Sequence, residues 1–300
     1  MALSTSSIKN RFSLSPLSIA LLGLLAAMYG PLLLHWVDGW LNKSISIQHE
    51  YFSHGLIGIP FAAYIAWGLR PQWQAQPDQW RPTGMGLIAL ASALYLSQLP
   101  DWMNISLPLM LAGLCLTLKG WPGLKLMGFP LALVAFATPS QLPYLIEPYI
   151  LPLQHFIASV AGFLLMQAGI DVTVDQIYLR VNDQMVEVAP HCAGLKMLFT
   201  SLYVALMLIY WNDVWRSRFR TGVFLAATVG VSVTGNIIRN AILSYFHGTG
   251  NEAGFVWLHE SWGGDLYSAL MLLSLIFILR LIQQYVPPRL ALNIKPDASV

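Results

Sequence analysis

Charged side chains are scarce in this sequence of 300 residues: Asp, Glu, Lys and Arg make up 10% of it, whereas soluble domains carry about a quarter. This scarcity excludes an intrinsically disordered chain. The 16 basic and 14 acidic residues give a net charge of +2, which excludes a strongly basic nucleic-acid-binding protein. Cysteine is also scarce: the two residues, Cys115 and Cys192, exclude a secreted domain held by several disulfides. The chain has no repeat with a period of 20–50 residues and no low-complexity tract.

Hydrophobic side chains are abundant instead, at 56% of the sequence, and the mean hydropathy is +0.59. A membrane-spanning helix needs roughly 20 mostly apolar residues. We therefore predict an all-α polytopic membrane protein, with the first apolar run kept as a span and not a signal peptide. The eight predicted spans lie near residues 16–37, 54–69, 84–100, 105–119, 126–140, 193–211, 221–246 and 266–284.

The few charges predict the orientation of these spans. With the N-terminus in the cytoplasm, 12 of the 16 basic residues fall on the cytoplasmic side, as the positive-inside rule requires. The four exceptions are Lys43, Arg180, Lys196 and Arg239. Both termini are then cytoplasmic, which an even number of spans demands.

Residues 143–190 do not fit a simple span. Residues 143–169 are apolar but contain three prolines and Glu147, and a ninth crossing would reverse the charge asymmetry, so we predict an interfacial or re-entrant helix on the outer face. Residues 172–189 alternate β-branched and polar side chains around Asn182-Asp183, which predicts a short β-hairpin; a plain loop is the alternative. Residues 1–300 thus form a single integral membrane domain, with extracytoplasmic residues 143–190 and cytoplasmic tails at 1–15 and 286–300.

Cys192 stands where this hairpin joins the sixth span. Pro190 suits the first turn of a helix, so we expect Cys192 in that turn, where free N–H groups favour a thiolate. Lys196 follows four residues later on the same helical face, and Gly194 lets another backbone approach. The alternative is a cysteine that only packs between helices, as we expect for Cys115 in its apolar run.

Two further polar features are predicted at the same membrane face. Arg239 lies within the seventh span, about 27 Å along it by helical rise, and Asn236 shares its face at i−3. The alternative is an arginine whose guanidinium extends to lipid headgroups. His259, beside Glu260, precedes the last span. A cysteine, a histidine and an arginine at one face suit attack on a carbonyl, proton exchange and stabilisation of an oxyanion or anchoring of a carboxylate.

A fourth polar cluster, residues 49–55, opens the second span from the outside. Glu50, Ser53 and His54 are candidates to line a substrate entrance or to support the first three residues. Its H-E-x-x-x-H spacing differs from the helical H-E-x-x-H pattern of zinc proteases, so we expect neither a metal nor another cofactor.

Together these motifs resemble the exosortase/archaeosortase family of membrane cysteine transpeptidases. The resemblance covers roughly residues 45–285, and the lead-in Pro190-His191 is similar to the cyanobacterial branch of the family. The family often has Cys-Ser-Gly where this sequence has Ala193 in the middle, so no hydroxyl role is carried over to that position. The matching residues, in chain order, are Tyr51, Ser53, His54, Gly55, Cys192, Gly194, Asn236, Arg239 and His259.

The resemblance implies an enzyme of the bacterial inner membrane whose active site faces the periplasm. Its expected partners are membrane lipid and secreted proteins with a C-terminal sorting signal, which consists of a Pro-Glu-Pro-like motif, a transmembrane helix and a basic tail. Cys192, assisted by Arg239 and His259, would cleave near that motif through a thioester. Two other functions stay open: a transporter, or an assembly factor for envelope polysaccharide, with Arg239 and the outer polar residues as a binding site.

Overall fold

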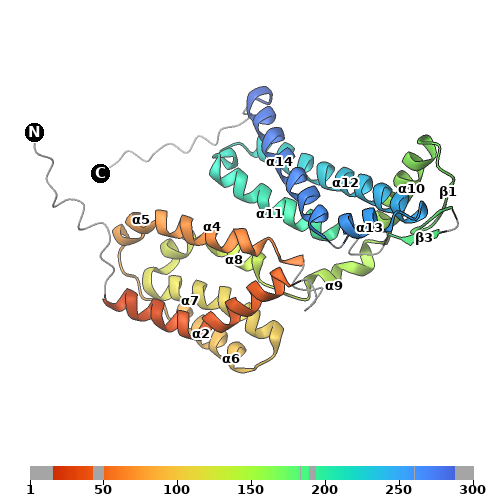
Figure 1. Ribbon diagram of the computed structural model, residues 1–300. Helices are drawn as coiled ribbons and strands as arrows, with labels where there is room; N and C mark the ends of the chain where they lie inside the picture. Colours follow the sequence, from red (N-terminus) through yellow and green to blue (C-terminus); the bar gives the residue numbers. More distant parts are fainter. Residues whose placement is uncertain (1–15, 43–50, 183, 189–193, 260, 288–300) are drawn as a thin grey trace, which may run out of the picture.

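The computed structural model describes residues 16–42, 51–182, 184–188, 194–259 and 261–287. Helices account for most of the described chain, and one small sheet interrupts them (Figure 1). The principal helices are α2 (Pro16–Leu41), α4 (Gly55–Gly68), α5 (Arg70–Ala75), α6 (Pro82–Leu96), α7 (Pro100–Leu126), α8 (Gly128–Ala137), α9 (Leu142–Ile146), α10 (Leu151–Gln167), α11 (Leu195–Trp211), α12 (Arg218–Gly248), α13 (Glu252–His259) and α14 (Trp262–Tyr285).

The helices form two groups, with α9 between them (Figure 1). In the N-terminal group α6 packs along α7, and α4 packs along α8. In the C-terminal group α12 is central, since α10, α11, α13 and α14 all pack against it. Helix α11 joins the groups: Leu195 and Tyr203 belong to the N-terminal core, whereas Ala205 and Ile209 belong to a core shared with α12 and α14.

Every predicted span falls on a helix, but among the described residues four helices are long and apolar enough to cross a membrane. The helices in the other four predicted spans are α4, α6, α8 and α11, which have 10 to 17 residues and fall short of the roughly 20 that a crossing takes. The count of eight spans is therefore not confirmed. The four candidates are Ile19–Leu41, Pro100–Leu126, Arg218–Gly248 and Trp262–Tyr285.

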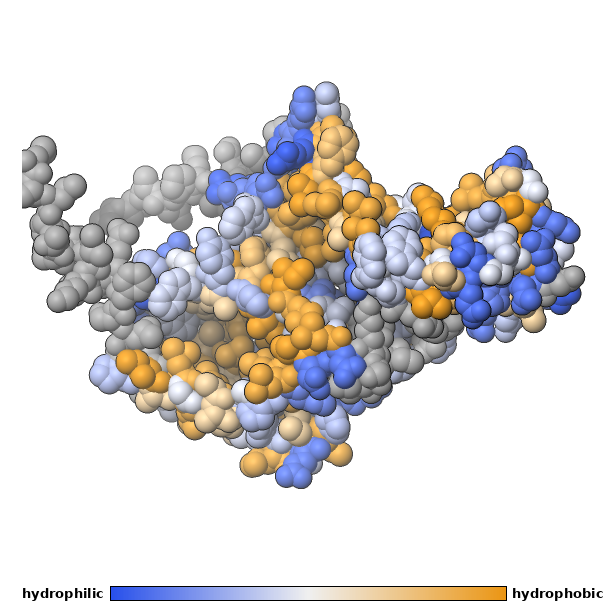
Figure 2. All heavy atoms as spheres, viewed as in Figure 1, coloured by the Kyte–Doolittle hydropathy of each residue, from blue (hydrophilic) through white to orange (hydrophobic). Residues whose placement is uncertain are grey.

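The surface agrees with a membrane protein. Leu270, Leu273 and Phe277 on α14 are each about 60% exposed, and an exposed apolar stripe of this kind is stable in lipid but not in water. Hydrophilic residues gather instead at the end formed by the strands and at the C-terminal end of α14 (Figure 2). The segment expected to be interfacial divides into α9, a short 3-10 turn and α10, with a break before Leu151.

The sheet has three strands where the sequence predicted two. Strands β1 (Val172–Asp175), β2 (Tyr178–Val181) and β3 (Gln184–Glu187) form an antiparallel meander with β2 in the middle. The turn that the sequence did not predict lies at Gln176, between β1 and β2. Its φ of 55° allows a two-residue connection, although glutamine is not a typical residue for such a turn. The expected turn at Asn182 is present, with φ of 48°, and Asp183 lies outside the described residues.

The start of α11 also differs from the prediction. The helix begins at Leu195, and Gly194 caps it with φ of 82°, a left-handed conformation that glycine adopts without strain. Lys196 is therefore in the first turn of α11, and no continuous helix joins it to the position four residues earlier. Cys192, for which we expected an i, i+4 relation with Lys196, lies outside the described residues.

Gly58 is essential for the contact between α4 and α11. A Cβ at this position would overlap the Tyr203 ring, whose hydroxyl donates a 2.9 Å hydrogen bond to the Leu133 carbonyl. We expect Gly58→Val to destabilise the protein by about 1–3 kcal/mol, the usual effect of overpacking. Thermal unfolding in detergent tests this, with Gly68→Val as the control because no neighbouring atom lies within 4 Å of a Cβ there. Equal unfolding midpoints for the two variants would contradict the expectation.

Candidate active site

One face of α12 carries a row of buried polar side chains. They recur every four residues, so they lie on one helical face, and none is more than 4% exposed. A row of this kind inside a candidate membrane span marks either helix packing or a functional site. Its members are Thr228, Ser232, Asn236, Asn240 and Ser244.

Asn236, in the middle of this row, meets the beginning of α11. A Cβ at Gly194 would lie 2.6 Å from Asn236 Cγ, so only glycine allows the two segments to approach this closely. Asn236 is 1% exposed, and neither of its amide atoms has a hydrogen-bond partner among the described residues. An unpaired buried polar group costs roughly 1–3 kcal/mol and calls for a functional or solvent partner.

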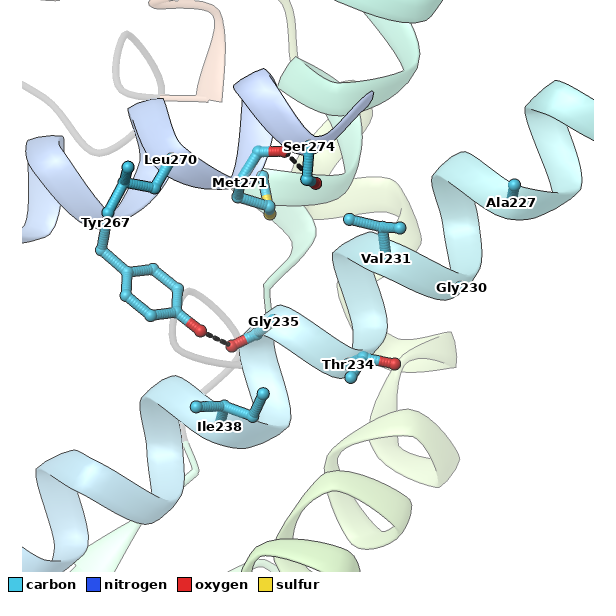
Figure 3. A pocket seen from close by; sticks show the side chains of 10 residues that line it. All are labelled: Ala227, Gly230, Val231, Thr234, Gly235, Ile238, Tyr267, Leu270, Met271 and Ser274. Atoms are coloured by element: carbon cyan, nitrogen blue, oxygen red, sulfur yellow. Dashed lines mark hydrogen bonds between the residues drawn. The ribbon is translucent and has the colours of Figure 1, made fainter. Parts of the chain in front are cut away.

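Arg239 lies on α12, one turn after Asn236, and its side chain approaches the start of α14. Its Nη2 atom is 3.8 Å from the position of a Cβ at Gly264, and it interacts electrostatically with Tyr267. The half-buried side chain has an Nε atom without a hydrogen-bond partner in the described part of the chain. Tyr267 donates a 2.5 Å hydrogen bond to the Gly235 carbonyl, which ties α14 to α12 beside the guanidinium (Figure 3).

His259 ends α13 and approaches the same junction. Its ring stacks on that of Phe255, one turn earlier, with centroids 5.1 Å apart and planes 13° apart. The carbonyl oxygen of Leu258, the preceding residue, lies 2.8 Å from a Cβ built at Gly264, the same position that borders Arg239. Gly264 thus brings together the end of α13, the start of α14 and the arginine.

The Tyr51–His54 motif packs against α11 and the end of α8. Tyr51 packs edge-on against Phe199, and the buried His54 ring lies 4.3 Å from the Tyr203 ring, with Nε2 3.1 Å from the Phe136 carbonyl oxygen. Ser53 is half-buried beside them. The structure therefore places this motif between α4, α8 and α11.

Three predicted site residues, Cys192, Glu50 and Glu260, lie outside the described residues. Lys196 is described and half-buried. Within the described ranges, no group of three or more His, Cys, Asp or Glu side chains has the arrangement of a metal site.

Two residues that support the candidate site were not predicted from the sequence. Tyr267 is one. The other is Gln154 on α10, 4% exposed, whose Nε2 donates a 2.8 Å hydrogen bond to the Val188 carbonyl, one residue after β3. A buried glutamine in an apolar helix is a signal that sequence reading can detect, because an amide there needs a partner.

A groove of about 580 Å³ runs between α12 and α14 (Figure 3). Small and apolar side chains line it, together with Gly235 and with Tyr267, which interacts electrostatically with Arg239. Both helices are candidate membrane spans. The other lining residues are Ala227, Gly230, Val231, Thr234, Ile238, Leu270, Met271 and Ser274.

The family model described as "Transmembrane exosortase" matches residues 36–276, which include both groups of helices and the whole junction around Arg239. No curated protein and no solved structure matches this chain.

Proposed function

The chain belongs to the transmembrane exosortase family, and on this premise we propose that it is a membrane-embedded cysteine transpeptidase. Its proposed substrates are secreted proteins with a C-terminal sorting signal: a Pro-Glu-Pro-like motif, a transmembrane helix and a basic tail. Cys192 is the proposed nucleophile, and Arg239 and His259 are the groups proposed to assist it.

The contact between Gly194 and Asn236 carries this proposal. Cys192 precedes Gly194 by two residues, and covalent geometry allows at most about 7.6 Å between α-carbons two residues apart. Asn236 shares a helical face with Arg239, and Gly264 links Arg239 to the turn that ends in His259. These contacts support the proposal that Cys192, Arg239 and His259, far apart in the sequence, act together at one junction of α11, α12, α13 and α14.

The chemistry follows from these residue types. The Cys192 thiolate attacks the scissile carbonyl carbon, and a positive group beside the carbonyl oxygen stabilises the resulting oxyanion. The C–N bond then breaks, the leaving amine takes a proton from the histidine, and a thioester remains on the cysteine. Water or an acceptor nucleophile attacks the thioester, returns its proton to the histidine and frees the thiolate.

Substrate access is proposed to occur from within the bilayer. The groove between α12 and α14 is apolar, lies on two candidate spans and borders Arg239, so a transmembrane helix in it would hold the adjoining motif near the junction. The orientation proposed from the charge asymmetry puts the junction on the periplasmic side of the inner membrane, with both termini in the cytoplasm.

Trapping the thioester tests this mechanism. Hydroxylamine added to the purified protein with a tagged reporter that carries the sorting signal is expected to release the reporter as its hydroxamate, because hydroxylamine attacks thioesters faster than water does. Mass spectrometry of the new C-terminus measures the product. If the protein cleaves at its normal rate but the released reporter ends in a carboxylate at every hydroxylamine concentration, a thioester intermediate is excluded.

A further inference from the structure

We propose that the outer edge of β3 binds the substrate as an added strand: an extended segment of the substrate polypeptide pairs with β3 and is led by it toward Cys192. The inference rests on the proposed function for the identity of the substrate. It adds the surface and the backbone groups that hold the peptide.

The hydrogen-bond pattern of the meander identifies the groups on this edge. The Val188 N–H donates to the Ile177 carbonyl at 2.9 Å, so Val188 points toward the β2 side. Backbone groups alternate in direction along a strand. Gln184 and Val186 therefore bond to β2, whereas the N–H and C=O of Met185 and Glu187 point away from it.

This edge is open in the described part of the chain. No hydrogen bond between described residues reaches the outer side of β3, and Met185 is 57% exposed. The other edge strand differs: Val172 of β1 is 7% exposed, and a Cβ at Gly162 of α10 would overlap the Val174 side chain. By the exposure of its residues, β3 is the more open of the two edge strands in the described part of the chain. An open strand edge recognises an extended peptide through main-chain hydrogen bonds.

The direction of β3 leads to the candidate active site. At its beginning, the Asn182 side chain donates a 3.1 Å hydrogen bond to the Gly248 carbonyl at the end of α12. After its end, Val188 belongs to the same buried cluster as Ile237 and Ala241, which flank Arg239. β3 thus follows α12 from its C-terminus back to the level of the arginine, as the position of the strands beside α12 in Figure 1 illustrates.

The strand is held firmly where it leaves the sheet. Val188 is fully buried, its N–H is bonded to Ile177, and its carbonyl accepts from Gln154. Cys192 follows Val188 by four residues, and Gly194 is packed on Asn236. A peptide aligned on β3 is therefore held in register with the segment that carries the proposed nucleophile.

Proline at position 185 tests the backbone role. Met185→Pro removes an outward N–H without removing a bond to β2, a place where proline is tolerated in an edge strand. We expect reporter cleavage to fall about tenfold or more, since a main-chain hydrogen bond is lost and the strand edge is blocked. Met185→Ala keeps the N–H and should cleave within about twofold of the unchanged protein. Equal cleavage by the proline and alanine variants, both with an unchanged thermal midpoint, would overturn the proposal.

Photo-crosslinking gives a second test that does not depend on cleavage or on the proline variant folding. In the Cys192→Ala background, p-benzoylphenylalanine introduced in place of Met185 should crosslink the uncleaved reporter. In place of Thr173 it should not, because Thr173 is on β1, three strand spacings or about 14 Å from an added strand. Crosslinking at both positions or at neither would refute edge binding. Normal cleavage by Cys192→Ala would instead refute the proposed function. The crosslinking result would then still show whether the reporter binds at the edge of β3.

Discussion

Replacing Cys192 by alanine is expected to abolish cleavage of the reporter while the protein still folds and inserts. Removal of a catalytic nucleophile lowers the rate by about 10⁴-fold or more, which puts cleavage below detection in cells. Immunoblotting of a co-expressed tagged reporter measures the ratio of cleaved to uncleaved protein. Cys192→Ser should be nearly as inactive, because a serine hydroxyl has a far higher pKa than a thiol and is a weaker nucleophile without a strong base beside it.

Cys115 provides the matched control. It is half-buried in α7 within an apolar run, and Cys115→Ala should cleave at the normal rate. A membrane-impermeant maleimide should modify Cys192 but not Cys115 in spheroplasts, which also tests the proposed periplasmic orientation. Normal processing by Cys192→Ala would exclude the cysteine mechanism.

Replacing Arg239 by alanine has the second largest expected effect. Loss of one donor to a developing oxyanion lowers kcat by about 10²–10³-fold, so cleavage by Arg239→Ala should fall by that factor. Arg239→Lys keeps the charge but loses the planar fork, and an intermediate rate is expected. Kinetics with purified protein distinguish the two roles considered for the residue: a fall in kcat indicates oxyanion stabilisation, and a rise in KM alone indicates anchoring of a substrate carboxylate.

Arg216 is the control for this substitution. It lies just before α12, 69% exposed and 3.4 Å from the Asp213 carboxylate, and an exposed ion pair contributes little. Arg216→Ala should cleave normally. An equal and small effect of both substitutions, with unchanged thermal midpoints, would contradict a catalytic role for Arg239.

Much of the helical architecture could be predicted from local pattern. Each predicted span coincides with a helix because runs of apolar residues with few breakers form helices wherever they are buried or in lipid. The number of crossings could not be predicted in the same way: α8 is apolar throughout but has only 10 residues. Hydropathy measures burial and does not separate burial in lipid from burial among other helices.

The candidate site was predictable in part. Asn236 and Arg239 are polar residues in an apolar run, and their spacing alone puts them on one face. The contribution of Tyr267 could not be predicted, because the hydrogen-bond partner of its hydroxyl is the Gly235 carbonyl, 32 residues away in the sequence. The start of α11 was misjudged because Pro190 is a valid first-turn residue, while the left-handed Gly194 depends on its contact with Asn236.

By itself, the scarcity of charge in the sequence determined that this is a membrane protein, since 10% charged residues cannot cover the surface of a soluble domain of this size. Sequence spacing also determined which polar residues of α12 share a face. Only the tertiary structure decided that Gly194, Asn236, Arg239, Gly264 and the end of α13 meet at one junction. It also decided that the Tyr51–His54 motif packs against Phe199 and Tyr203 of α11. The physical reason is that these contacts join residues tens of positions apart and depend on which side chains leave room for a neighbouring backbone.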